Sequence, residues 1–205
     1  MSAASAPENE FSDVGTSSVV RRWVNISTGG HLSGVSWGTG PAEFVLVAPS
    51  GGQARDLDAV ALALDRPAIV LDLPGTGRSS GPATTPRRAG RAVAEAIASF
   101  GPRAQVWAGV GDGATAVLSA AARAGRPVGL LLLVDPDLTD DVLALVDAAT
   151  NPVAVARTDA GPVSDSLVEG LRVRDVPVTD LGVPASGLGE ALAAHLRRTV
   201  TVPTS

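Results

Sequence analysis

QVWAGVGDGATA, residues 105–116, joins an apolar run to a glycine-rich turn and a series of small residues. An apolar run of this length is typical of a strand that is buried on both faces of a sheet. The three glycines at 109, 111 and 113 favour a sharp turn. The small residues that follow, as far as Arg123, predict a helix. The stretch therefore predicts a strand, a tight turn and a helix, which is the repeating unit of α/β folds.

The same alternation of strand and helix patterns extends outward in both directions. Two runs rich in β-forming residues, 19–26 and 31–37, are separated by turn residues and predict a β-hairpin. The remaining patterns predict strands at 43–48, 68–71, 128–134, 152–156 and 173–178, and helices at 57–64, 86–100, 138–148, 163–171 and 187–198. This order predicts an α/β fold with a mostly parallel, doubly wound sheet, helices on both faces and an N-terminal β-hairpin.

Length and hydrophobic content indicate one folded domain. The chain has 205 residues, of which 45% are hydrophobic, enough for one sizeable core and too few for two ordinary domains. We expect a single domain at 18–200, a disordered segment at 1–17 and a tail at 201–205. No stretch is apolar enough to span a membrane, and the N-terminus lacks the pattern of a signal peptide, so we expect a cytoplasmic protein without membrane contact.

Charge and residue types exclude several kinds of chemistry. The net charge of -5 argues against nucleic acid as a partner. The absence of cysteine excludes disulfides, thiolate metal sites and cysteine nucleophiles. With two histidines in all, His31 and His195, a multi-histidine metal centre is not expected, and we predict no metal and no cofactor.

Three motifs give the chain a resemblance to a known family. They are the strand that leads into APSGG at 48–52, the loop DLPGTGRS at 72–79, and the strand, turn and helix around Gly111. In order and spacing they resemble the α/β-hydrolases over about residues 18–200, and the loop at 72–79 is similar to the Asp-x-x-Gly-x-Gly-x-Ser of that family. The resemblance implies a nucleophile on the sharp turn, an acid and a histidine at strand ends, and an oxyanion hole.

When these positions are carried over, the usual catalytic side chains are missing. The nucleophile position falls on Gly111, which has no side chain. The acid position falls on Gly161, with Asp159 two residues earlier, and the family's histidine is expected near 181–184, where none exists. His195 lies inside the last predicted helix.

Other family features point to a pocket at the strand ends. His31 belongs to the hairpin, which is normally remote from the site. The oxyanion amides are expected from Asp112 and Ser50. The segment 135–139 leaves no room for a lid domain, so we expect an open or shallow pocket.

The candidate site residues are the polar groups that follow the strands, where ligands bind in open α/β sheets. Our candidates are Asp112 and Asp159 as catalytic residues, and Ser50, Gln53, Gly111, Asp112 and Asp135 as ligand-binding residues.

Several functional hypotheses are compatible with these residues. The first is a triad-less enzyme that binds a small molecule or short peptide and performs non-hydrolytic tailoring chemistry, such as isomerisation, epimerisation or cyclisation. The second is a non-catalytic pseudoenzyme that binds or scaffolds. The third is an atypical hydrolase that uses Asp112 as nucleophile. A further alternative treats GVGDGA at 109–114 as a dinucleotide fingerprint. Under the hypotheses that keep the α/β-hydrolase fold, a second copy of the chain or a partner protein would cover the open pocket.

Overall fold

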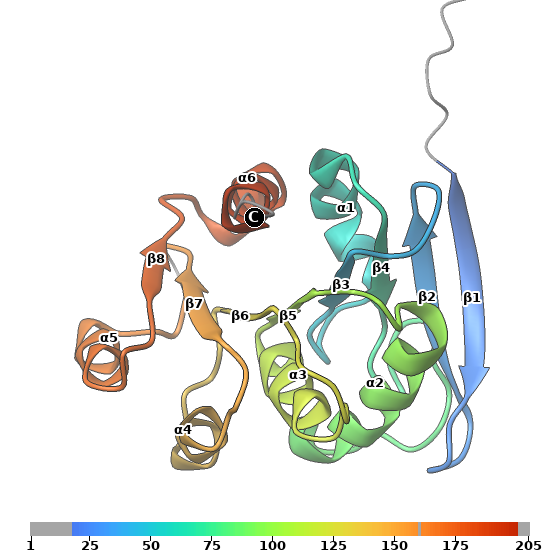
Figure 1. Ribbon diagram of the computed structural model, residues 1–205, viewed down its shortest axis with the longest axis horizontal. Coiled ribbons are helices and arrows are strands. Elements are labelled where there is room, and N and C mark those ends of the chain that lie inside the picture. The colour runs from blue at the N-terminus through green and yellow to red at the C-terminus, as the bar shows by residue number, and fades with distance from the viewer. Residues whose placement is uncertain (1–17, 160, 201–205) are drawn as a thin grey trace, which may run out of the picture.

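The computed structural model describes residues 18–159 and 161–200. Within them, eight strands form one sheet in the order β1-β2-β4-β3-β5-β6-β7-β8 (Figure 1). The strands are β1 (Val19–Asn25), β2 (His31–Trp37), β3 (Phe44–Val47), β4 (Ala68–Leu71), β5 (Val106–Val110), β6 (Leu130–Val134), β7 (Val153–Arg157) and β8 (Val178–Asp180). The strand that contains the opening stretch, β5, lies at the centre of the sheet between β3 and β6.

Only the first two strands depart from the parallel arrangement. β1 and β2 form an antiparallel hairpin, and β2 also pairs antiparallel with β4. Every other neighbouring pair is parallel. As a result, β2 begins at the edge of the sheet where β4 ends, and His31 therefore lies at the same edge as the loop that follows β4.

Helices cover both faces of the sheet. They are η1 (Ala54–Leu57), α1 (Asp58–Leu64), α2 (Pro86–Phe100), α3 (Asp112–Ala121), α4 (Asp140–Asp147), α5 (Asp165–Arg172), η2 (Ala185–Gly187) and α6 (Leu188–Val200). Helices α1 and α6 lie together on one face, and α2, α3 and α4 lie on the other (Figure 1). Buried residues of α5 belong to the same hydrophobic cluster as those of α2 to α4.

The core owes its two layers to strands that are apolar along their whole length. In β3, Val45 and Val47 face the cluster beneath α2 and α3, whereas Phe44 and Leu46 face the cluster beneath α1 and α6. All four residues are buried, as expected for a strand covered on both faces. This burial on both sides fixes the position of the sheet between its helices.

Small residues bring α2 and α3 close together. A methyl group placed on Gly90 of α2 would lie 2.4 Å from the Cβ of Ser119 on α3. The Ser119 hydroxyl donates a hydrogen bond of 2.7 Å to the carbonyl of Arg87 across the same contact. This close packing holds α3, and with it the turn at Gly111, firmly against the sheet.

Most of the element predictions are confirmed, including the hairpin, the central strand and turn, and the helix at 86–100. The strand predicted at 173–178 is wrong. α5 ends at Arg172, Asp175 adopts a left-handed conformation with φ 53°, and the Val176 amide donates back to the carbonyl of Leu171. These contacts form a turn at the C-terminus of the helix. Residues 173–176 belong to that turn, and the strand therefore begins only at Val178.

Two further predictions concern parts of the chain near its ends. The disordered segment at 1–17 and the tail at 201–205 lie outside the described residues. Among the residues that the structure describes, no helix is long and apolar enough to cross a membrane.

Candidate functional site

The turn after β5 has the geometry that its three glycines suggest. The backbone of Gly111 has φ 57° and ψ -127°, a conformation that residues other than glycine rarely adopt. A Cβ on Gly109 would lie 2.4 Å from the carbonyl oxygen of Gly113, and a Cβ on Gly113 would lie 2.8 Å from that of Val47. The Gly111 amide donates 2.8 Å to the carbonyl of Val134 at the end of β6. The turn is therefore held by close packing against the end of β3 and by a hydrogen bond to the end of β6.

Ser50 and Asp112, two of the predicted site residues, are in direct contact. The backbone amide of Ser50 donates a hydrogen bond of 2.7 Å to Oδ1 of Asp112, and the Ser50 hydroxyl donates to Oδ2 of the same carboxylate. Ser50 follows β3 and is exposed, whereas Asp112 opens α3 and is partly buried. A carboxylate is favourable at this position because the N-terminus of a helix carries partial positive charge. The Ser50 amide, which we expected to stabilise an oxyanion, is thus engaged by the Asp112 carboxylate.

Asp135 and Asp159 lie at the ends of the next two strands. Asp135 has φ 45°, and its carboxylate accepts hydrogen bonds from the amide of Thr158 at 2.9 Å and from its hydroxyl at 2.7 Å. Asp159 is exposed, and its amide donates to the carbonyl of Val183. Within the described part of the chain, neither aspartate forms a hydrogen bond with Ser50 or Asp112. Asp135 therefore connects the ends of β6 and β7 in this structure.

Gln53 faces a different neighbourhood, around the buried carboxylate of Asp72. It lines a cavity of about 100 Å³ together with Asp72, Arg21 and Arg78. Asp72 is 1% exposed, and its carboxylate accepts hydrogen bonds from the backbone amides of Ala54 at 2.5 Å and Arg78 at 3.0 Å. Asp72 was not among our candidates, although it begins the loop motif at 72–79. Its contacts fix that loop against η1.

His31 lies in the hairpin, as predicted, and contacts the loop that follows β4. Its Nδ1 lies 2.8 Å from the hydroxyl of Ser80, and its Nε2 lies 3.1 Å from the carbonyl oxygen of Arg78. Because a carbonyl can only accept, Nε2 donates to Arg78, and in the neutral imidazole Nδ1 then accepts from the Ser80 hydroxyl. His31 is half-buried at the edge where the parallel strands end, not remote from it. The contact between His31 and Ser80 could not be predicted from a local sequence pattern, because 49 residues separate the two.

His195 lies within α6, as predicted. Burial lowers the pKa of His195, and the nearby charge of Arg198 lowers it further. In the described ranges, no group of three or more histidine or acidic side chains is arranged to hold a metal ion.

Comparison with known proteins identifies esterases and other hydrolases as similar chains. No family model matches the sequence. The esterase Rv0045c of Mycobacterium tuberculosis is 34% identical over 110 residues, which make up 52% of this chain and 37% of the esterase. The matched region thus spans little more than a third of the length of this curated relative.

Solved structures establish the fold. A structure of the Mycobacterium tuberculosis esterase Rv0045c has a TM-score of 0.78 at 18% identity, and covers 91% of this chain and 92% of that one. The thioesterase domain from the curacin biosynthetic pathway has a TM-score of 0.73 at 12% identity, covering 89% and 98%. The haloalkane dehalogenase DbeA from Bradyrhizobium elkanii has a TM-score of 0.69 at 10% identity, covering 88% and 98%. The chain has the α/β-hydrolase fold, and because the parallel strands β3 and β4 precede β5, β5 is not the first strand of a dinucleotide-binding unit.

These similarities correct our functional hypotheses. We expected a triad-less non-hydrolytic enzyme, such as an isomerase, epimerase or cyclase, or a non-catalytic pseudoenzyme. The 34% identical relative is an esterase, and the structural neighbours are hydrolases, which contradicts both hypotheses. Both hypotheses rested on the missing side chain at Gly111, whereas the structure brings the polar side chains of Ser50 and Asp112 together beside that turn.

Proposed function

We propose that the protein hydrolyses small ester substrates, with Ser50 as nucleophile and Asp112 as the base that activates it. The observation that carries this proposal is the contact between the Ser50 hydroxyl and the Asp112 carboxylate, at the ends of β3 and β5. The esterase relative supports the type of reaction, and the α/β-hydrolase fold supports the location. The pair differs from the serine–histidine arrangement expected of the family, because the base is a carboxylate.

The proposed chemistry proceeds in two steps. The Ser50 oxygen attacks the ester carbonyl while the Asp112 carboxylate takes its proton, and that proton then leaves with the alcohol. Asp112 next takes a proton from a water molecule, whose oxygen attacks the acyl-enzyme to release the carboxylic acid and restore the Ser50 hydroxyl. The first amides of α3, those of Asp112 and Gly113, have no partner within the helix and are suited to the developing oxyanion.

Two features of the site bear on the substrate. The space above Gly111 is open, because an added Cβ would meet only the Pro49 side chain, at 3.4 Å. Residues 135–139 connect β6 directly to α4, so we infer a site without a lid. Asp135, after β6, stays a ligand-binding candidate and Asp159, after β7, a catalytic one, whereas Gln53 lines the separate cavity beside Asp72. An open site with a weakly basic carboxylate favours short acyl groups and good leaving groups over large, unreactive esters.

A covalent probe tests the proposal most directly. We would incubate the protein with an alkyl fluorophosphonate, which reacts with activated serines, and locate the label by peptide mass spectrometry. Hydrolysis of p-nitrophenyl acetate would be measured in parallel. We expect the label on Ser50, background hydrolysis in Ser50→Ala, and a rate reduced by about 10²-fold or more in Asp112→Asn, since a general base contributes about 10²–10⁴-fold.

Ser80→Ala is the control, because the Ser80 hydroxyl lies beside the imidazole of His31. It should retain the wild-type rate and the label on Ser50. A label on Ser80, or hydrolysis that survives in Ser50→Ala, would contradict our assignment of the nucleophile. A wild-type rate equal to that of buffer would contradict the proposed function itself.

A further inference from the structure

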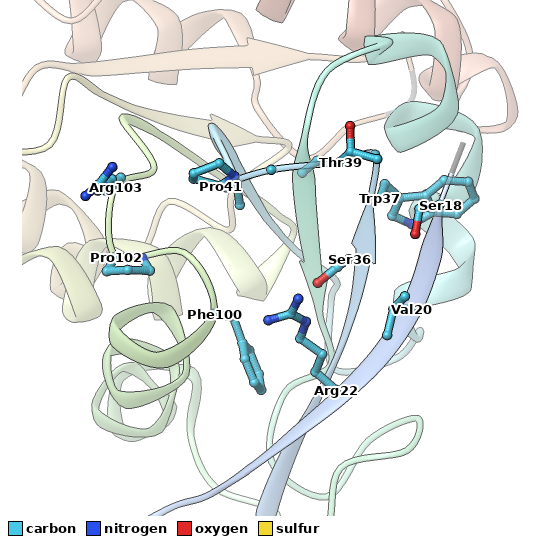
Figure 2. Close-up of a pocket in the computed structure, with 14 residues that line it drawn as sticks. Ser18, Val20, Arg22, Ser36, Trp37, Thr39, Pro41, Phe100, Pro102 and Arg103 are labelled. Atoms are coloured by element: carbon cyan, nitrogen blue, oxygen red, sulfur yellow. The ribbon is translucent and has the colours of Figure 1, made fainter. Parts of the chain in front are cut away.

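A pocket of about 490 Å³ lies at the opposite edge of the sheet from Ser50 and Asp112. It is formed by the end of β2, the start of β1, the loop after β2, and the residues that follow α2 (Figure 2). Because β2 runs antiparallel to its parallel neighbours, its last residue, Trp37, pairs with Ala68, the first residue of β4. The pocket is therefore separated from the proposed catalytic site by the length of the central strands.

The charged groups of this pocket are both cationic. Arg22 and Arg103 line it, and its described lining residues include no aspartate or glutamate. Both arginines are exposed, and neither guanidinium has a hydrogen bond or ion pair with another described residue. By contrast, Arg21, the neighbour of Arg22 on the other face of β1, bonds Ser33 at 2.8 Å. The pocket thus holds two guanidinium groups without a counter-charge.

The rest of the lining suits an apolar group and hydrogen-bond acceptors. Phe100, Pro41 and Pro102 supply ring surfaces, and the Arg22 guanidinium points into the space between Phe100 and Ser36 (Figure 2). Trp37 lies in the wall, and its indole N–H is buried without an acceptor among the described residues. A guanidinium carries a positive charge and can only donate hydrogen bonds, so its natural partner is an anion. The volume lies within the range of about 300–1,000 Å³ that is typical of small-molecule sites.

We propose that this pocket is a second binding site, which takes a small aromatic carboxylate. The carboxylate pairs with the Arg22 guanidinium, which points into the pocket, since the planar guanidinium matches a carboxylate in two hydrogen bonds. Arg103 lies apart from it beside Pro102 and adds only longer-range attraction (Figure 2). The aromatic ring packs against Phe100 and the two prolines. The assignment is independent of the proposed hydrolysis, because the pocket shares no residue with Ser50, Asp112 or their neighbours.

Calorimetric titration of the full chain with 2-naphthoate tests the site. The neutral isostere 2-naphthalenemethanol and inorganic phosphate serve as comparison ligands. We expect naphthoate to bind with one-to-one stoichiometry, Arg22→Gln to weaken binding about tenfold, the effect of one lost charge-assisted hydrogen bond, and Arg103→Gln to weaken it less. Both residues are exposed, so these variants should fold normally.

Arg172→Gln is the matched control, because it removes one positive charge from an exposed position on α5. It should bind naphthoate like the wild type. Equal affinity for naphthoate and its alcohol would overturn the anion site, and equal affinity for phosphate would overturn the aromatic carboxylate as its ligand. Naphthoate binding that is absent, or that survives unchanged in Arg22→Gln, would overturn the pocket as the site.

Discussion

The buried carboxylate of Asp72 offers a sharp test of what holds the loop at 72–79 in place. Asp72→Ala removes the acceptor for two amides, those of Ala54 and Arg78. The Ala54 amide is buried, and leaving it unsatisfied costs about 1–3 kcal/mol. The Arg78 amide is only partly buried, so its loss costs about 0.5–1.5 kcal/mol. With the weak 3.9 Å ion pair to Arg21 adding little, we expect a loss of about 1.5–4.5 kcal/mol.

A loss of this size is a large part of the stability of a typical domain, about 5–15 kcal/mol. It would be measured by urea unfolding at pH 7, followed by circular dichroism and extrapolated to zero urea. Asp72→Asn should lose less, about 1–2 kcal/mol, because its amide oxygen still accepts one hydrogen bond while its NH₂ faces the other donor. Asp147→Ala is the control, since it breaks an exposed ion pair with Arg174 that is worth about 0–1 kcal/mol. If Asp72→Ala is no more destabilising than Asp147→Ala, the loop does not depend on this carboxylate.

Three further predictions concern glycines and a histidine. Gly113→Ala should destabilise the fold by about 1–3 kcal/mol, because its Cβ would lie 2.8 Å from a backbone carbonyl oxygen of β3's end. In urea unfolding Gly170→Ala should stabilise it by about 0.4–1 kcal/mol, since nothing lies closer than 3.9 Å within α5, and similar effects at both sites would contradict the role given to close packing. Burial, reinforced by Arg198, lowers the pKa of His195 in the folded chain, so the free energy of unfolding should fall as the pH drops through about 6.5. His195→Gln should lose that part of the pH dependence, and an unchanged slope between pH 7.5 and 5.5 would show that His195 is not its source. Gly111→Ser should not raise p-nitrophenyl acetate hydrolysis above the wild-type rate, as neither histidine contacts the turn among the described residues, and a rise of about tenfold would contradict this.

Much of the fold was predictable because each signal was local. The short, fully apolar runs of β3 and β6 are typical of strands covered on both faces. Pro86 indicated where α2 begins, because proline is favoured at the first position of a helix. The weak point was 173–178, where alternating valines imitate a strand. There, hydrogen bonds back to α5 and a left-handed Asp175 outweigh the local pattern.

The candidate site was only partly predictable. Ser50 and Asp112 were named because each follows a strand, but that the serine donates to the carboxylate depends on the register of β3 against β5. Asp135 was named for the same reason, yet the structure directs its carboxylate to Thr158. Position at a strand end is thus a local property, whereas the direction of a side chain is set by its neighbours from other parts of the chain.

The stretch at 105–116 shows where the two kinds of information meet. The sequence by itself determines the strand, the turn and the helix there, because apolar periodicity and glycine spacing act within a few residues. It also determines that Gly111 presents no side chain. Only the tertiary structure decides which polar groups gather around that turn, since Ser50 is 62 residues from Asp112 and His31 is 49 residues from Ser80. Their contacts follow from strand order and packing, which no local pattern of residues specifies.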